Sequence, residues 1–181
     1  DRTHTNSLKY DFAVQRGKPK DVLPLWVADM DFQVSSYIQE ALSGSVAHGI
    51  FGYSEAEGSY FEAVAGWMSR HYGWNVEETW LVKTPGIVFA LAQAVRAFTE
   101  PGDAVLLQQP VYYPFSQVIR DNGRKIVDNT LVQGEDGRYR IDFTDFEEKI
   151  RSAHVKLFFL CNPHNPVAVS YTHLTLPTKL E

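Results

Sequence analysis

A nearly continuous apolar run, Val155 to Cys161 (VKLFFLC), constrains the fold more than any other segment. A strand with one solvated face alternates apolar and polar side chains, whereas a strand covered on both faces is apolar almost throughout. Strands of the second kind are typical of parallel sheets, whose crossover helices cover the two faces. We therefore expect a buried strand of a parallel sheet here.

Helical and strand patterns alternate along the rest of the chain. Such alternation predicts an α/β domain with a mostly parallel sheet and flanking helices. Ligands of these sheets bind in the crevice beyond the carboxyl ends of the strands. The expected helices are Ser35 to His48, a segment from the capping-box pair Ser54 and Glu57 to Gly73, Ile87 to Phe98, Pro114 to Asn122, and Thr144 to about Ser152. The expected extended segments are Trp80 to Lys83, Ala104 to Leu107, and Arg124 to Val132.

Composition narrows the possible partners. The chain has 181 residues, 44% of them hydrophobic, which is enough for one domain with a core. The net charge of -5 argues against nucleic acid or an anionic membrane as the main partner. No apolar run approaches the roughly 20 residues that span a bilayer. The single cysteine, Cys161, excludes an internal disulfide and favours a reducing, cytoplasmic location.

Three segments at expected strand ends have unusual chemistry. Thr84-Pro85-Gly86 precedes a helix, where unsatisfied N–H groups and the helix dipole attract an anion, although a simple tight turn is the plainer interpretation. Aromatic rings in residues 110–115 could stack on a flat ligand or simply pack. Asn162 to Pro166 forms a rigid turn, with amide donors facing the crevice or with no ligand at all. His164 reads as a hydrogen-bonding spacer without a catalytic role, and no metal-ligand pattern is present.

Taken together and in order, the motifs resemble fold-type-I pyridoxal-phosphate (PLP) enzymes, in particular the MalY/PatB-like cystathionine β-lyase subgroup. The resemblance covers residues 1–167, and the ordered set of motifs is far more specific than any single one. The matching segments are DRTHTNSLKYD at 1–11, LWVADMDF at 25–32, HGIFGY at 48–53, TPGIV at 84–88, QPVYYPF at 109–115 and CNPHNP at 161–166.

The resemblance implies a role for each matching position. The backbone amides of Ile87 and Val88 would hold the cofactor phosphate. Tyr112 would stack on the pyridine ring, and Asn165 would donate a hydrogen bond to its phenolic oxygen. Tyr53 would reach the phosphate of a neighbouring subunit, which implies a homodimer. As a further implication, Ala28 and Asp29 would line the substrate side.

The same resemblance implies a division of the chain. Residues 1–48 would form an N-terminal arm and a small-domain segment, and residues 49–167 an incomplete PLP-binding large domain. Residues 168–181 match nothing in the family and have a foreign-looking sequence. The Schiff-base lysine of the family is absent from the matching positions, and Lys179 is no substitute for it. We expect no catalytic residue in this chain and an inactive fragment.

The parent protein is expected to be a PLP-dependent carbon–sulfur β-lyase. It would convert a sulfur-containing amino acid, such as cystathionine, into a thiol, pyruvate and ammonia. Two alternatives remain open: a class I/II aminotransferase on the same scaffold, and a non-catalytic PLP-binding regulatory protein. Without the resemblance, the residues support an α/β ligand-binding domain and no more.

Overall fold

The computed structural model describes residues 1–170 and divides the chain into two compact units. The first unit comprises Asp1–Glu55, and the second begins at Ala56. Their assignment to the small and large domains of the PLP enzymes remains a prediction. No helix within residues 1–170 is both long enough and apolar enough to cross a bilayer.

The first unit contains a short 3₁₀ helix, η1 (Val14–Arg16), and one α-helix, α1 (Ser36–His48). Ser35 caps α1, because its side chain accepts a hydrogen bond from the backbone N–H of Tyr37 at 3.3 Å. Gly49 ends the helix in the left-handed region at φ 72°. Both ends of this helix were predicted correctly.

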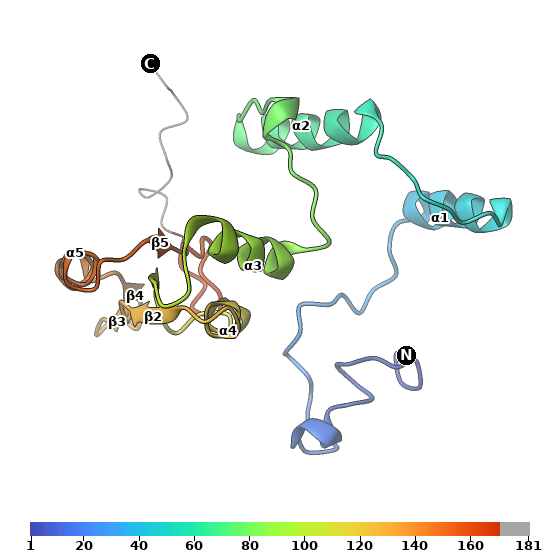
Figure 1. Cartoon of the computed structure of the whole chain (residues 1–181). Helices are drawn as coiled ribbons and strands as arrows, with labels where there is room; N and C mark the ends of the chain where they lie inside the picture. Colours follow the sequence, from blue (N-terminus) through green and yellow to red (C-terminus); the bar gives the residue numbers. More distant parts are fainter. Residues whose placement is uncertain (171–181) are drawn as a thin grey trace. The chain divides into compact units, whose positions relative to one another are not determined.

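The centre of the second unit is a parallel sheet in the order β2-β1-β5. Its strands are β1 (Ala104–Leu107), β2 (Lys125–Asp128) and β5 (Leu157–Phe158), and Val105 lies opposite Ile126 on one side and Leu157 on the other. Every residue of β1 is buried, since this strand has neighbours at both edges and helices packed against it. The expectation of a mostly parallel sheet with flanking helices is confirmed (Figure 1).

Two helices complete the core beside this sheet. They are α3 (Ile87–Phe98) and α4 (Pro114–Asp121), which pack against each other. Val95 of α3 and Ile119 of α4 are fully buried in one cluster with Val105 and Leu107. A third helix, α5 (Phe143–Ser152), begins at Asp142, whose carboxylate accepts the backbone N–H groups of Thr144 and Asp145 at 3.0 Å each.

Three features expected from the sequence differ from the structure. Residues 80–83 form no strand: the 3₁₀ helix η2 (Glu78–Trp80) is followed by unpaired backbone. Trp80 and Leu81 line a pocket with α2 (Gly58–Tyr72), but Trp80 and Val82 stay largely exposed and only Leu81 is half-buried. The expected capping box also fails, since α2 begins after Glu57 with no side-chain cap. In addition, the buried strand expected at residues 155–161 is wrong in length and in burial. Hydrogen bonding to β1 extends only from Lys156 to Phe159, and both residues of β5 are only half-buried, since β5 lies at the edge of the described sheet.

The remaining described segments are short. Strands β3 (Val132–Gln133) and β4 (Tyr139–Arg140) form an antiparallel pair. Near the end of the described chain, an antiparallel bridge joins His164 to Val169, with Ala168 in the left-handed region at φ 55°. Most of the foreign-looking segment, residues 171–181, lies outside the described residues.

Replacing a core side chain of α4 is expected to destabilise the second unit. Ile119 is fully buried, so Ile119→Ala should lower the free energy of unfolding by about 2–5 kcal/mol in chemical denaturation. The same substitution at Ile38, which is half exposed on α1, is the matched control and should change it by less than about 0.5 kcal/mol. Equal effects at the two positions would contradict the described core.

Candidate functional site

The carboxyl ends of β1 and β5 bring two loops together. Because the two strands are parallel neighbours, the segments that follow them leave the same edge of the sheet. The backbone N–H of Tyr112, in the first loop, donates to the carbonyl oxygen of Asn165, in the second, at 2.9 Å. Tyr112 is 41% exposed and Asn165 is also exposed, so both side chains are accessible at this edge.

His164 forms a second connection between these loops. Its ring is almost completely buried, and Nε2 lies 3.0 Å from the carbonyl oxygen of Pro110. A carbonyl oxygen can only accept, so Nε2 carries the proton. The backbone of His164 also donates to Val169 and accepts from Ala168, each at 2.7 Å. These bonds agree with the role of a hydrogen-bonding spacer that the sequence indicates.

The N-terminus of α3 presents backbone donors. Gly86 occupies the N-cap position, and no side chain of the described residues caps the helix. The first helical hydrogen bond runs from the N–H of Ala90 to the carbonyl of Gly86, which leaves the N–H groups of Ile87 and Val88 outside the helical ladder. There is also open space where a Cβ on Gly86 would lie. This end of the helix therefore has the character of an anion site.

The chain path sets the position of this helix end. The turn at residues 99–103 reverses the chain between α3 and β1, and Val95 and Leu91 of α3 pack on the core that contains β1. Helix and strand consequently run in opposite directions. The N-terminus of α3 therefore faces the carboxyl ends of the strands, the same edge that carries Tyr112 and Asn165.

A buried polar network supports the loop after β1, and the sequence analysis missed it. Gln108 Nε2 donates to Asn129 Oδ1 at 3.0 Å, and both residues are buried. Asn129 Nδ2 in turn donates to Asp145 Oδ2 at 2.7 Å, and Lys149 Nζ lies 2.8 Å from the same oxygen. The hydrogen bond from Lys149, followed by that from Asn129, lowers the pKa of Asp145. The only sequence signal was a pair of glutamines after an apolar strand, which does not identify their partners.

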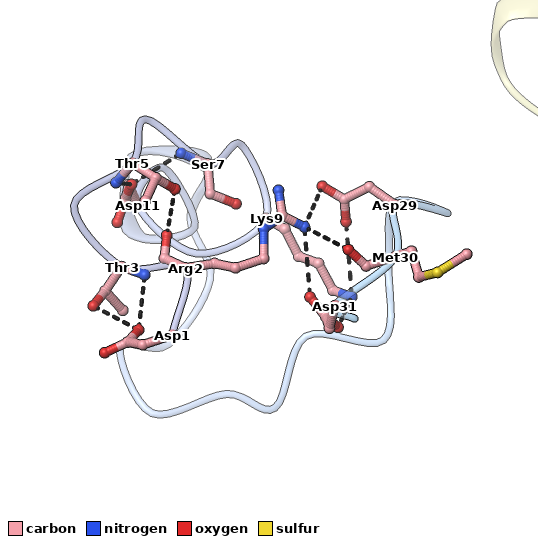
Figure 2. Close-up of polar contacts among 10 residues, drawn as sticks. All are labelled: Asp1, Arg2, Thr3, Thr5, Ser7, Lys9, Asp11, Asp29, Met30 and Asp31. Atoms are coloured by element: carbon pink, nitrogen blue, oxygen red, sulfur yellow. Dashed lines mark hydrogen bonds and ion pairs between the residues drawn. The ribbon is translucent and has the colours of Figure 1, made fainter. Parts of the chain in front are cut away.

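The first unit holds a separate charged cluster, which joins residues 1–11 to residues 29–31 (Figure 2). Arg2 Nη1 lies 2.9 Å from Asp29 Oδ2, and Lys9 Nζ lies 2.7 Å from Asp31 Oδ2. The hydrogen bond from Lys9 lowers the pKa of Asp31, and the bond to Asp31 raises the pKa of Lys9. The predicted substrate residue Asp29 is thus an ion-pair partner in the structure.

Asp11 organises the backbone at the other end of this cluster. Its Oδ1 accepts the N–H of His4 at 2.9 Å, and its Oδ2 accepts those of Thr5 and Ser7 at 3.1 and 2.9 Å. These backbone donors, His4 first, lower the pKa of the carboxyl group.

The structure thus brings together only some of the residues that the sequence singled out. Tyr112 and Asn165 share one edge of the second unit with the helix end at Ile87 and Val88. Tyr53, fully exposed, belongs to the first unit. Ala28 and Asp29 lie in the first unit as well. Residues 1–170 contain no group of three or more His, Cys, Asp and Glu side chains suited to a metal ion.

Comparison with known families defines the class of protein. The profile of the family "Aminotransferase class I and II" matches residues 20–178, and the chain belongs to this family.

Individual relatives include carbon–sulfur lyases and aminotransferases. The chain is 46% identical over 172 residues to cystathionine beta-lyase PatB of Bacillus subtilis, a match that covers 95% of the chain and 44% of the relative. It is 30% identical over 173 residues to protein MalY of Escherichia coli, with the same two coverages. The crystal structure of cystalysin from Treponema denticola, which contains pyridoxal 5'-phosphate, matches with a TM-score of 0.85 at 35% identity, covering 94% of the chain and 44% of that protein. The chain thus spans less than half the length of these relatives.

Acid is expected to open the charged cluster of the first unit. The pKa values of Asp11 and Asp31 are lowered in the folded state, so their stabilising effect is present above the ordinary aspartate pKa of about 3.9 and is lost as the pH falls through the lower folded values. In an NMR titration, the amide signals of His4, Thr5 and Ser7 should move with a midpoint below the ordinary aspartate pKa of about 3.9.

Asp11→Asn tests the assignment directly. It removes the titrating group and should abolish this step, while Asp21→Asn, at an exposed position of the same unit, should leave it in place. If the amide signals moved with an unshifted midpoint near 3.9, the contacts of Asp11 would be refuted.

Proposed function

We propose that the chain is part of a PLP-dependent carbon–sulfur β-lyase of the cystathionine β-lyase type. One observation carries the proposal: an exposed tyrosine ring, an exposed asparagine amide and an uncapped helix N-terminus face the same edge of a parallel sheet. The similarity to PatB, a cystathionine beta-lyase, supports the reaction class. The similarity to cystalysin, which contains pyridoxal 5'-phosphate, supports the cofactor. The protein would take a sulfur-containing amino acid and release a thiol, pyruvate and ammonia.

The donor set fits the chemistry of PLP. The backbone N–H groups of Ile87 and Val88 suit a phosphate dianion, and Gly86 leaves space for its close approach. The ring of Tyr112 suits the face of a pyridine, since offset aromatic stacking favours parallel flat groups. The side-chain amide of Asn165 offers a donor for a phenolic oxygen.

Each of these residues has a positioning role. PLP, when bound, supplies an electron sink for a substrate carbanion. The amides at the start of α3 would hold the phosphate end of the cofactor, and Tyr112 would stack on its ring. Asn165 holds the phenolic oxygen and favours its charged form. His164 sets the spacing between Tyr112 and Asn165, because its bond to Pro110 ties the two loops together.

The proposal extends to residues of the first unit. Ala28 and Asp29 line the substrate side, and Tyr53 reaches the phosphate bound by a second subunit of a homodimer. The lysine that binds the cofactor and transfers protons comes from outside the positions matched here. The cytoplasmic location expected from the sequence remains a prediction.

An aminotransferase is the second candidate. Membership of the aminotransferase class I and II family supports this candidate, and an aminotransferase would use the same cofactor contacts. Both reactions pass through the same carbanion at the substrate α-carbon. The lyase is preferred because the chain is 46% identical to a relative named cystathionine beta-lyase PatB.

The reaction products separate the two candidates. The full-length protein, loaded with PLP, is given cystathionine in one assay, and alanine with a keto-acid acceptor in another. Release of pyruvate and free thiol should be faster than transfer of the amino group. Faster transfer would replace the lyase with an aminotransferase.

Two substitutions test the cofactor contacts. Tyr112→Ala should weaken PLP binding by at least about fivefold, because the lost aromatic stack alone costs about 1 kcal/mol beyond the lost area. Asn165→Ala keeps the backbone bond to Tyr112 but removes the amide donor, so the pH-dependent change in PLP absorbance should move to higher pH. Tyr60→Ala, on α2, is the control and should alter neither property. An unchanged absorbance titration in Asn165→Ala would refute the assignment of Asn165.

A further inference from the structure

Val27 has an unfavourable backbone conformation. Its φ of 61° lies in the left-handed region, where a β-branched side chain is strained. The next two residues are Ala28 and Asp29. Strain of this kind persists only where surrounding contacts hold the backbone in place.

Cationic side chains of the N-terminal arm supply such contacts on both sides of Val27. The guanidinium of Arg16 lies 5.8 Å from the ring centre of Trp26, within the range of a cation–π contact. After Val27, Arg2 Nη1 pairs with Asp29 Oδ2 at 2.9 Å and donates to the carbonyl of Met30 at 3.3 Å (Figure 2). The strained residue is therefore held between two fixed neighbours.

Lys9 is the most enclosed of these cations. It is only 7% exposed, and its Nζ lies 2.7 Å from Asp31 Oδ2 and 3.8 Å from Asp29 Oδ1. Solvent-exposed ion pairs contribute little, but a buried ammonium between two carboxylates is poorly screened. Removing it would leave Arg2 as the cation paired with both carboxylates, at 2.9 Å from Asp29 and 3.5 Å from Asp31. Arg2 and Lys9 together fix the Asp29 carboxylate from two directions.

We propose that Lys9 and Arg2 are positioning residues that hold the strained Val27–Asp29 segment in the shape required for substrate binding. This inference rests on the proposed assignment of Ala28 and Asp29 to the substrate side. It adds two residues distant in sequence to the substrate site, neither of which has to touch the substrate.

The test compares Lys9→Met with Lys20→Met in the full-length protein carrying PLP. Methionine keeps the length of the side chain and removes the charge. Lys20 is exposed and forms no ion pair within the described part of the chain, so it is a matched control on the same arm.

Lys9→Met should raise KM for cystathionine on the order of tenfold or more, with PLP affinity unchanged. It should also speed backbone hydrogen exchange at residues 27–31, whereas Lys20→Met should change neither property. Lys9→Arg, which keeps the charge, should recover most of the loss.

A strain-relieving variant guards against a folding defect. Glycine adopts positive φ without cost, so Val27→Gly should reduce the effect of Lys9→Met on exchange and on KM. If Lys9→Met alone does not fold, the comparison is made in the Val27→Gly background. Equal KM and equal exchange in the Lys9 and Lys20 variants would overturn the proposal. If the wild-type protein failed to release thiol, the lyase assignment would be wrong. Faster hydrogen exchange at residues 27–31 in Lys9→Met would still support the role of the cations.

Discussion

Parallel pairing of β1 with both of its neighbours is the constraint on which the second unit depends. A strand bonded at both edges and covered by helices has no exposed backbone, which is why all four of its residues are buried. Parallel direction places the ends of β1, β2 and β5 at one edge, and the polar residues that follow them meet there. The bonds from Tyr112 to Asn165 and from His164 to Pro110 depend on this arrangement. The position of the candidate site is thus a consequence of strand direction.

Charge in the chain is organised locally. In the second unit, the backbone donors at the start of α3 can bind an anion, and no acidic side chain occupies the first turn of that helix. In the first unit, by contrast, carboxylates and cations neutralise one another around a strained backbone segment. The start of α3 suits an anionic cofactor group, whereas the charged cluster of the first unit holds a loop in one conformation. Both use groups that are fixed before any ligand binds, which reduces the ordering cost of binding.

Much of this architecture was predictable from local signals. The parallel sheet followed from an apolar run and alternating elements, and α1 followed from its flanking serine and glycine. The strand expected at residues 80–83 is absent, since a short apolar run does not by itself distinguish a paired strand from a loop that lies beside a helix. The network of Gln108, Asn129, Asp145 and Lys149 joins residues up to 41 positions apart, and no local pattern encodes such pairs. The site residues Ile87, Val88, Tyr112 and Asn165 came from ordered motifs, and the structure adds the hydrogen bonds that hold two of them together.

A crystal structure of the full-length protein with PLP tests the central claim most directly. The account predicts that the phosphate lies within hydrogen-bond distance of the N–H groups of Ile87 and Val88. It also predicts that the ring of Tyr112 lies parallel to the pyridine and that the amide of Asn165 reaches its phenolic oxygen. A phosphate bound away from the start of α3, or a cofactor ring that does not contact Tyr112, would contradict it.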